Sequence, residues 1–188
     1  MAEGKRIISP VVIWITGLSG AGETTIGHAV FCELFARYPN TVFLDGDAMR
    51  VIVGDELGHT KAERLTNAFR MSRMCQYLVN QGHNVVCSTM SLFPEIWDWN
   101  RKNIAGYVEI YLRASNEALV ARDTKGVYAA LSDGRTSNVI GWDLPFDEPS
   151  ADLVINTDSS DSQAIRNHVS TIIHYLSLRE TAHGAASL

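Results

Sequence analysis

An uninterrupted apolar run leads directly into a glycine-rich turn near the start of the chain. Residues 11–16 read VVIWIT, and residues 17–25 read GLSGAGETT. A run without polar alternation predicts a strand that is buried on both faces. A helix is expected to follow from Thr24 to about Arg37. This strand–turn–helix unit indicates a parallel sheet with helices packed against it.

The turn has the spacing of a phosphate-binding loop, with Gly17, four residues, Gly22, one residue and then the hydroxyl of Thr24. Backbone N–H groups of such a loop approach a phosphate closely, and the positive end of the helix dipole adds to the attraction. The alternative, a glycine turn without a ligand, is disfavoured by the strand before it and the helix after it. The predicted nucleotide-binding residues are Gly17, Leu18, Ser19, Gly20, Ala21, Gly22, Glu23, Thr24 and Thr25.

Glu23 occupies the position at which such a loop carries a lysine that reaches the β- and γ-phosphates. Two unit charges ~4 Å apart interact by about 4 kcal/mol at an effective dielectric constant near 20. A reversed charge would therefore weaken phosphate binding or transition-state stabilisation, and less so if the side chain turns into solvent. The backbone N–H groups would still bind phosphate.

The rest of the chain alternates short apolar runs with amphipathic stretches. Further strands are predicted over residues 41–45, 84–89, 107–113 and 151–156. The clearest helix covers residues 61–81, and a last one begins near Asp161. We therefore predict one α/β domain, residues 1–188, with a five-stranded parallel sheet between helices and a flexible tail over residues 179–188.

One long segment, residues 124–150, breaks this alternation. Its residues 134–150 hold two glycines and two prolines and show little periodicity. Loops of this length in a compact domain are usually functional, so we expect a lid over the site.

Composition narrows the class of partner. The formal net charge is −5 and no dense Lys/Arg patch is present, which argues against a nucleic-acid partner. No apolar run approaches the ~18 residues of a membrane span, so no membrane partner is expected. The three cysteines, Cys32, Cys75 and Cys87, are expected to be buried reduced thiols, as in a cytoplasmic protein.

Several later motifs, taken in order with the glycine loop, resemble those of adenylylsulfate kinases. These motifs are LDGDAMR (44–50), DELGHT (55–60), ERLTNAFR (63–70), RDTKGVY (122–128) and NVIGWDLPFDEPSADLVINT (138–157). The family consists of P-loop kinases that move the γ-phosphate of ATP to a ribose 3′-hydroxyl. The resemblance covers about residues 12–157 and implies a three-layer P-loop kinase fold, ATP and Mg²⁺ as cofactors, a small-molecule nucleotide acceptor and a homodimer.

Two carboxylates follow the second predicted strand. Asp45 and Asp47 stand at its carboxyl end, where parallel sheets bind ligands, and can hold Mg²⁺-bound water or accept a hydroxyl proton. The alternative is a turn capped by aspartate. Which of the two would be the base stays open. The resemblance also implies that Thr24 and Asp45 bind the metal.

Further roles come from the resemblance alone. Arg50, Asn67 and Arg70 match acceptor-binding positions, although Asn67 and Arg70 would otherwise be a solvated helix face. Arg122 resembles a residue that packs against the adenine of ATP. Lys125 resembles a lysine of the lid that contacts substrate, with a catalytic role, and it is also a candidate to replace the cation missing at position 23.

The segment MSLFP, residues 90–94, departs from the family pattern. Ser91 keeps a position described in the family as a phosphoserine candidate, and it is counted among the catalytic candidates. Leu92 and Pro94 stand where proline and arginine are usual, so one acceptor-side cation is missing, and Arg101 is a candidate to replace it. The pattern resembles the divergent cytidine diphosphoramidate kinases, whose acceptor is cytidine-based. Of Trp97 and Trp99, at least one is expected in the core.

Three interpretations stay open from the sequence. The favoured one is an active nucleotide 3′-kinase that takes adenylylsulfate or a cytidine diphosphoramidate-type acceptor. Glu23 supports the second, a nucleotide-binding pseudokinase without turnover. The third is an active enzyme into which Glu23 has been introduced.

Overall fold

A five-stranded parallel sheet forms the centre of the molecule, as predicted. The structure, a computed structural model, describes residues 9–53, 56–123 and 125–185. The strand order is β2-β3-β1-β4-β5, and every neighbouring pair is parallel. The strands are β1 (Val12–Gly17), β2 (Thr41–Asp45), β3 (Asn84–Ser88), β4 (Tyr107–Arg113) and β5 (Leu153–Asn156).

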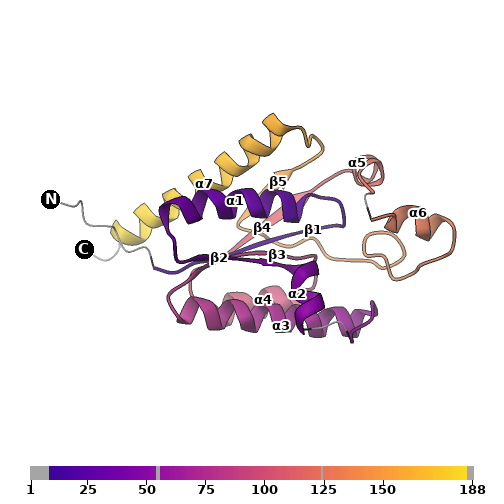
Figure 1. Cartoon of the computed structure of the whole chain (residues 1–188), viewed down its shortest axis with the longest axis horizontal. Coiled ribbons are helices and arrows are strands. Elements are labelled where there is room, and N and C mark those ends of the chain that lie inside the picture. The colour runs from indigo at the N-terminus through magenta and orange to yellow at the C-terminus, as the bar shows by residue number, and fades with distance from the viewer. Residues whose placement is uncertain (1–8, 54–55, 124, 186–188) are drawn as a thin grey trace.

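Helices cover both faces of this sheet. α1 and α7 lie on one face, and α3 and α4 lie on the other with α2 at the edge (Figure 1). The helices are α1 (Glu23–Arg37), α2 (Gly46–Val53), α3 (Lys61–Asn80), α4 (Pro94–Asn103), α5 (Asn116–Ala121), α6 (Val127–Ser132) and α7 (Ser162–Ala185). These three layers confirm the predicted fold class.

The central strand explains the continuous apolar run with which the chain begins. β1 pairs with β3 on one side and β4 on the other, and its six residues are all buried. Helices on both faces leave no solvated side for polar residues to occupy. The loop that follows β1 is thus anchored to the central strand of the sheet.

α1 packs unusually close to β3 because Gly27 has no side chain. A Cβ atom added at Gly27 would lie 1.9 Å from the Ser88 Oγ. The Ser88 hydroxyl itself donates a 2.9 Å hydrogen bond to the carbonyl oxygen of Glu23, in the first turn of α1. This contact fixes the start of α1 over the end of β3.

The described part of the predicted lid segment, residues 125–150, packs on the phosphate loop. It contains the short helix α6, which the sequence analysis missed. The ring centroids of Tyr128 and Trp142 lie 4.1 Å apart, and the Tyr128 hydroxyl donates a hydrogen bond to the carbonyl oxygen of Ser19. A Cβ atom at Gly141 would lie 2.9 Å from Leu18, so this part of the segment also touches the loop.

One sequence-based expectation stays a prediction and another needs correction. The tail is predicted to be flexible from residue 179; α7 continues through Ala185, and residues 186–188 lie outside the described part. Cys75 and Cys87 are buried as expected, whereas Cys32 is exposed because it lies on the solvent side of α1. Over the described residues, no helix combines the length and apolar character that a membrane crossing requires.

Candidate active site

The carboxyl ends of three neighbouring strands meet in one pocket. The phosphate loop follows β1, Asp45 ends β2, and Ser88 ends β3. Ser19, Gly20, Glu23 and Thr24 of the loop line this pocket. Parallel sheets bind ligands at this edge, which is also where the sequence places the candidate site.

The loop has the backbone form that phosphate binding requires. Gly20 and Gly22 adopt φ angles of +88° and +104°, which only glycine adopts without strain. The Gly22 carbonyl accepts the first helical hydrogen bond, from Ile26 at 2.9 Å. The free N–H groups of the first turn of α1 are therefore directed toward the pocket.

Thr24 and Asp45, the two metal ligands that the family resemblance implies, lie in contact with each other. The Thr24 hydroxyl donates a 2.7 Å hydrogen bond to Asp45 Oδ2. The other oxygen, Asp45 Oδ1, accepts from the backbone N–H groups of Asp47 and Ala48 at 3.1 Å each, which fixes the start of α2. A hydroxyl and a carboxylate are oxygen donors that suit Mg²⁺, which usually completes its shell with water and substrate phosphates.

Protein ligands alone do not make a metal centre here. Across residues 9–53, 56–123 and 125–185, no group of three or more His, Cys, Asp and Glu side chains is arranged to hold a metal ion. The Thr24–Asp45 pair therefore fits a nucleotide-bound Mg²⁺ better than a permanent metal site.

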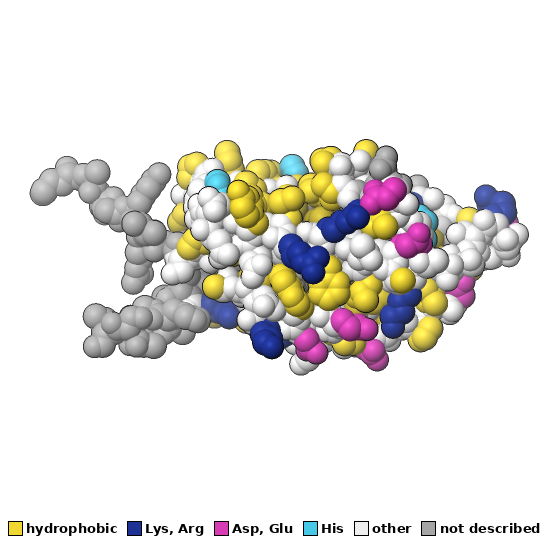
Figure 2. All heavy atoms as spheres, turned by 90° about the horizontal axis from the view of Figure 1, so that it is seen from below, with side chains coloured by type: hydrophobic (Ala, Val, Ile, Leu, Met, Phe, Trp, Pro, Cys, Tyr) yellow, Lys and Arg dark blue, Asp and Glu magenta, His cyan; other side chains and the backbone are white. Residues whose placement is uncertain are grey.

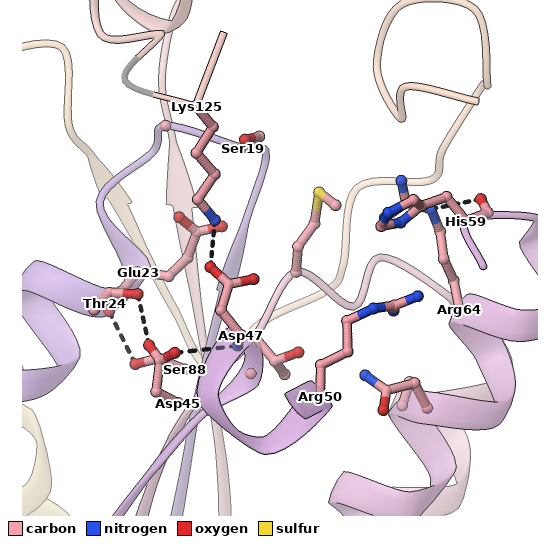
Figure 3. Close-up of a pocket in the computed structure, with 16 residues that line it drawn as sticks. Ser19, Glu23, Thr24, Asp45, Asp47, Arg50, His59, Arg64, Ser88 and Lys125 are labelled. Atoms are coloured by element: carbon pink, nitrogen blue, oxygen red, sulfur yellow. Dashed lines mark hydrogen bonds and ion pairs between the residues drawn. The ribbon is translucent and has the colours of Figure 1, made fainter. Parts of the chain in front are cut away.

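Glu23 turns into the pocket instead of into solvent. Its half-buried carboxyl group points toward the Lys125 ammonium group (Figure 3). Burial raises the pKa of Glu23 to about 7, and the positive charge of Lys125 offsets this only in part. Near neutral pH this position therefore carries less than a full negative charge, which reduces the electrostatic conflict inferred from the sequence.

Lys125 reaches across the pocket from the lid segment. Its Nζ atom forms an ion pair with Asp47 Oδ2, and both side chains are more than half exposed. The lysine therefore lies between the carboxylates of Glu23 and Asp47, on the phosphate-loop side of the pocket (Figure 3).

The opposite wall carries two arginines and a histidine. Arg50 donates to the carbonyl oxygens of Leu57 and Gly58. Arg64 Nε donates to the carbonyl oxygen of His59 at 2.9 Å. Burial, followed by the charges of Arg64 and Arg50, lowers the pKa of His59, so its ring is favoured as the neutral form. This wall is suited to an anionic ligand.

Asn67 completes that wall from α3. Its side chain is 8% exposed, and its Oδ1 atom has no hydrogen-bond partner among the described residues. A buried amide oxygen without a partner is costly, so this atom is available to a donor group of a ligand.

Of the predicted loop residues, Gly17, Leu18, Ala21, Gly22 and Thr25 do not line the pocket, and four candidates from other segments also lie outside it. Arg70 donates to the Val53 carbonyl and to Glu56, and it borders a separate apolar hollow between α2 and α3. Ser91 is fully buried, with its N–H bonded to Thr16 Oγ1 at 3.0 Å, because the 90–94 segment turns into the core. Arg101 pairs with Glu109 instead of reaching back to the site. Arg122 bonds to carbonyl oxygens of Gly20, Thr157 and Asp158, so it lies beside the loop.

Seven residues that line the pocket had no predicted role: Gly46, His59, Arg64, Ala68, Ser88, Thr89 and Met90. His59 and Arg64 lie within the motifs DELGHT and ERLTNAFR, so the motifs themselves were the available signal. Ser88 ends β3 and Thr89 and Met90 follow it, and their position at a strand end was the corresponding signal. Trp97 is buried and its Nε1 donates to the Ser91 carbonyl at 3.0 Å, which confirms that at least one of the two tryptophans belongs to the core.

The surface formed by α2, α3 and α4 mixes charges of both signs. Figure 2, which views the molecule from this side, shows Lys and Arg side chains interspersed with Asp and Glu and with hydrophobic groups. The visible face carries no continuous basic stripe of the kind that follows a nucleic-acid backbone.

The fold and the pocket together define a P-loop kinase. The family described as adenylylsulphate kinase matches residues 9–156. The chain therefore belongs to the adenylylsulfate kinase family, and the predicted membership is confirmed. Its relatives are kinases, so the chain is a member of a family of phosphotransferases.

Individual relatives refine this placement. The chain is 39% identical over 170 residues to a cytidine diphosphoramidate kinase of Campylobacter jejuni, covering 90% of this chain and 98% of the relative. It is 36% identical over 168 residues to an adenylyl-sulfate kinase of Oceanobacillus iheyensis, covering 88% of this chain and 83% of the relative. The structure of the Mycobacterium tuberculosis APS kinase in complex with AMPPNP and APS superposes with a TM-score of 0.82 at 28% identity. The superposition covers 90% of this chain and 98% of that kinase.

Proposed function

We propose that this chain transfers the γ-phosphoryl group of ATP to the ribose 3′-hydroxyl of a cytidine diphosphoramidate-type nucleotide. The observation that carries the proposal is a pocket in which a phosphate loop faces a cationic wall across two carboxylates. One side suits the donor phosphates and the other suits an anionic acceptor. The nearly full-length similarity to a cytidine diphosphoramidate kinase and the unusual 90–94 segment favour this acceptor over adenylylsulfate.

Each group has a defined task in the proposed reaction. The acceptor hydroxyl oxygen forms a bond to the γ-phosphorus as the bond to the β-phosphate oxygen breaks, and ADP leaves. Asp45 or Asp47 accepts the hydroxyl proton. Arg50, Arg64 and Asn67 orient the acceptor, and Thr24 and Asp45 would hold Mg²⁺, which neutralises charge on the donor phosphates when bound. Most of the catalysis is positioning and charge neutralisation.

A coupled assay of ADP release tests this proposal. We expect turnover with MgATP and a cytidine diphosphoramidate-type acceptor, and at least about tenfold lower kcat/KM with adenylylsulfate, a difference of about 1.4 kcal/mol in transition-state binding. Equal kcat/KM values would overturn the choice of acceptor. Absence of turnover with both acceptors, also after Glu23→Lys, would overturn the kinase function.

Glu23 favours a second candidate, a nucleotide-binding protein with little or no turnover. It leaves the loop backbone intact but places a carboxyl group beside the phosphate site. In that case AMPPNP would raise Tm, since a ligand that binds the native state stabilises it, while ADP release stays at background. A homodimer, also proposed by family analogy, is tested by light scattering.

A further inference from the structure

The phosphate loop of this chain lacks its own lysine, so positive charge near the donor phosphates has to come from another segment. Within the described residues, the basic side chains that line the pocket are Arg50, His59, Arg64 and Lys125. Lys125 lies beside the phosphate loop, whereas the other three lie on the opposite wall (Figure 3). Among the described basic residues that line the pocket, Lys125 of the lid segment is therefore the one on the side where a triphosphate would bind.

The cations of the opposite wall are held in place by other contacts. Arg50 is bonded to two backbone carbonyl oxygens of the turn before α3. Arg64 bonds to the carbonyl oxygens of His59 and Asn138, at 2.9 and 3.3 Å. Moving either guanidinium group to the loop would leave these carbonyl groups without their donors, so neither is suited to replace the loop lysine.

We propose that Lys125 supplies the phosphate-binding cation that position 23 does not, by exchanging its ion pair with Asp47 for the phosphates of the bound nucleotide. The inference rests on the proposed kinase function, because it names the residue that neutralises the donor. It also assigns Asp47 the role of holding the lysine over the loop while nucleotide is absent.

The ion pair between Lys125 and Asp47 is suited to this exchange. The side chains are 58% and 67% exposed, and ion pairs in contact with solvent are weak. A triphosphate offers several anionic oxygens, and charge-assisted bonds to phosphate are among the stronger hydrogen bonds of proteins. The ammonium group therefore gains by moving from one carboxylate to the phosphate chain.

The backbone that carries Lys125 is fixed independently of its side chain. The Asp123 carboxylate accepts hydrogen bonds from the N–H groups of Val127, Tyr128 and Ala129 at 2.7, 2.8 and 2.9 Å. The Tyr128 hydroxyl donates to the Ser19 carbonyl of the loop. The lysine can thus change its partner while the segment remains in place.

A double-mutant cycle between positions 23 and 125 tests the exchange. In the unaltered background, we expect Lys125→Ala to weaken AMPPNP binding at least about tenfold and to lower kcat/KM by about 100-fold, as for loss of one preorganised charge donor. In the Glu23→Lys background, Lys125→Ala is expected to lower AMPPNP affinity and kcat/KM by less than about fivefold each, because the loop again has its own cation. Equal losses in the two backgrounds would overturn the proposal.

Two further variants separate charge from folding. Lys125→Arg keeps the positive charge and is expected to recover most of the AMPPNP affinity. Lys102→Ala removes an exposed lysine of α4 that does not line the pocket, and we expect no change in binding. AMPPNP binding by calorimetry does not require turnover, so it tests Lys125 even if no acceptor is phosphorylated. Unchanged affinity after Lys125→Ala would overturn the inference and leave the kinase function standing.

Discussion

Glu23 is the residue at which local chemistry and family pattern disagree most. A lysine there would contribute a charge to the donor phosphates, and this chain instead has a carboxyl group whose pKa burial raises to about 7. The group is therefore closer to neutral in the folded protein than its ordinary pKa of 4.5 suggests. The loop backbone retains its phosphate-binding form, so Glu23 bears on the rate of transfer more than on the existence of the site.

The raised pKa has a consequence for stability that does not require any ligand. The folded state favours the protonated form of the Glu23 carboxyl group. The contribution of this group to the free energy of unfolding is therefore complete below about pH 4.5 and is lost as the pH rises through about 7. We expect this effect to reduce the free energy of unfolding by up to about 3 kcal/mol between these limits.

Urea denaturation at pH 5 and pH 8 measures this effect. In Glu23→Gln the decrease in stability over this range should be smaller than in the unaltered protein, since the amide does not ionise. Glu33→Gln changes an exposed carboxylate of the same helix, paired with Arg37 at 3.6 Å, and serves as the matched control. If the free energy of unfolding of both variants depends on pH as it does in the unaltered chain, burial of Glu23 does not raise its pKa.

Residue types and spacing identified only part of the pocket. The loop, Asp45, Asp47 and Asn67 could be predicted because each follows a strand or lies within an ordered motif. Arg70 illustrates what spacing misses: it lies one helical turn from Asn67, yet its guanidinium turns to Val53 and Glu56. The direction of a long side chain depends on tertiary partners, which the one-dimensional sequence does not specify.

At the scale of elements, α1 packs so closely on β3 that replacing Gly27 by alanine should destabilise the helix contact, the opposite of the usual effect of alanine in a helix. Alanine normally stabilises a helix relative to glycine by about 0.5–1 kcal/mol. At Gly27 the added Cβ would lie 1.9 Å from Ser88 Oγ and 3.2 Å from Ser88 Cβ, so the two elements would have to separate. We expect Gly27→Ala to destabilise the protein by about 1–3 kcal/mol, as overpacking does.

The partner of this contact supplies the control. Ser88→Ala removes the Oγ atom that makes the closest approach and leaves the Cβ atom at 3.2 Å. In the Ser88→Ala background, Gly27→Ala should lower the free energy of unfolding clearly less. Thermal or urea unfolding of the unaltered protein, the two single variants and the double variant measures this difference. If Gly27→Ala lowers stability equally with and without the Ser88 hydroxyl, contact with that hydroxyl is not the cause of the destabilisation.

The N-terminus of α3 connects helix capping to the acceptor wall. Thr60 and Glu63 form a capping box, and Glu63 Oε1 also accepts from the Gly58 N–H at 2.9 Å. The same turn presents the Leu57 and Gly58 carbonyl oxygens to Arg50. Loss of the cap therefore disturbs both the helix and the arginine that it helps to position.

We expect Thr60→Ala to lower stability by about 1 kcal/mol and to raise the KM for the acceptor more than that for ATP. Thr66→Ala, on the exposed face of the same helix, removes a hydroxyl that bonds back to the Ala62 carbonyl, together with an exposed methyl group, and should change neither quantity appreciably. Thermal unfolding and steady-state ADP release measure the two effects. An unchanged acceptor KM in Thr60→Ala would show that the turn does not position Arg50.

Elements differ in how much of their structure the sequence specifies. The five strands and the helices α1, α3 and α7 were predictable because each repeats an apolar pattern over several turns or residues. The short helices α5 and α6 span six residues each, too few for a periodic pattern to emerge. α6 depends instead on the Asp123 carboxylate, which accepts three backbone N–H groups at its start.

At the scale of the whole molecule, a second polar cluster joins three elements away from the pocket. Arg101 of α4 pairs with Glu109 of β4 at 2.6 Å and with Asp152 at 3.4 Å, and Arg179 of α7 lies 3.6 Å from Asp152. Glu109 is completely buried, and burial raises its pKa although Arg101 opposes the shift. The site residues lie at the carboxyl ends of the strands, whereas this cluster lies toward the amino end of β4.

This separation allows stability to be changed without changing the chemistry. Arg101→Ala leaves the buried Glu109 carboxylate without its cation, and breaking a buried pair in this way is strongly destabilising. Because Arg101 is partly exposed, we expect a loss of about 2–3 kcal/mol, or a decrease in Tm of about 5–10 °C for a chain of this size. Well below the lowered Tm, kcat and both KM values should be unchanged, since Glu109, Ser150 and Asp152, to which Arg101 bonds, do not line the pocket.

The double variant Arg101→Ala/Glu109→Gln separates the unpaired charge from lost packing. Replacing the carboxylate by an amide removes the buried charge, so part of the lost stability should return. Arg166→Ala, which removes an exposed arginine of α7 bonded to Gln163, should leave Tm nearly unchanged and controls for surface charge. If Arg101→Ala instead lowers kcat at temperatures where the protein is fully folded, the sheet transmits changes at its amino end to the phosphate loop, and the two ends of the molecule are not energetically independent.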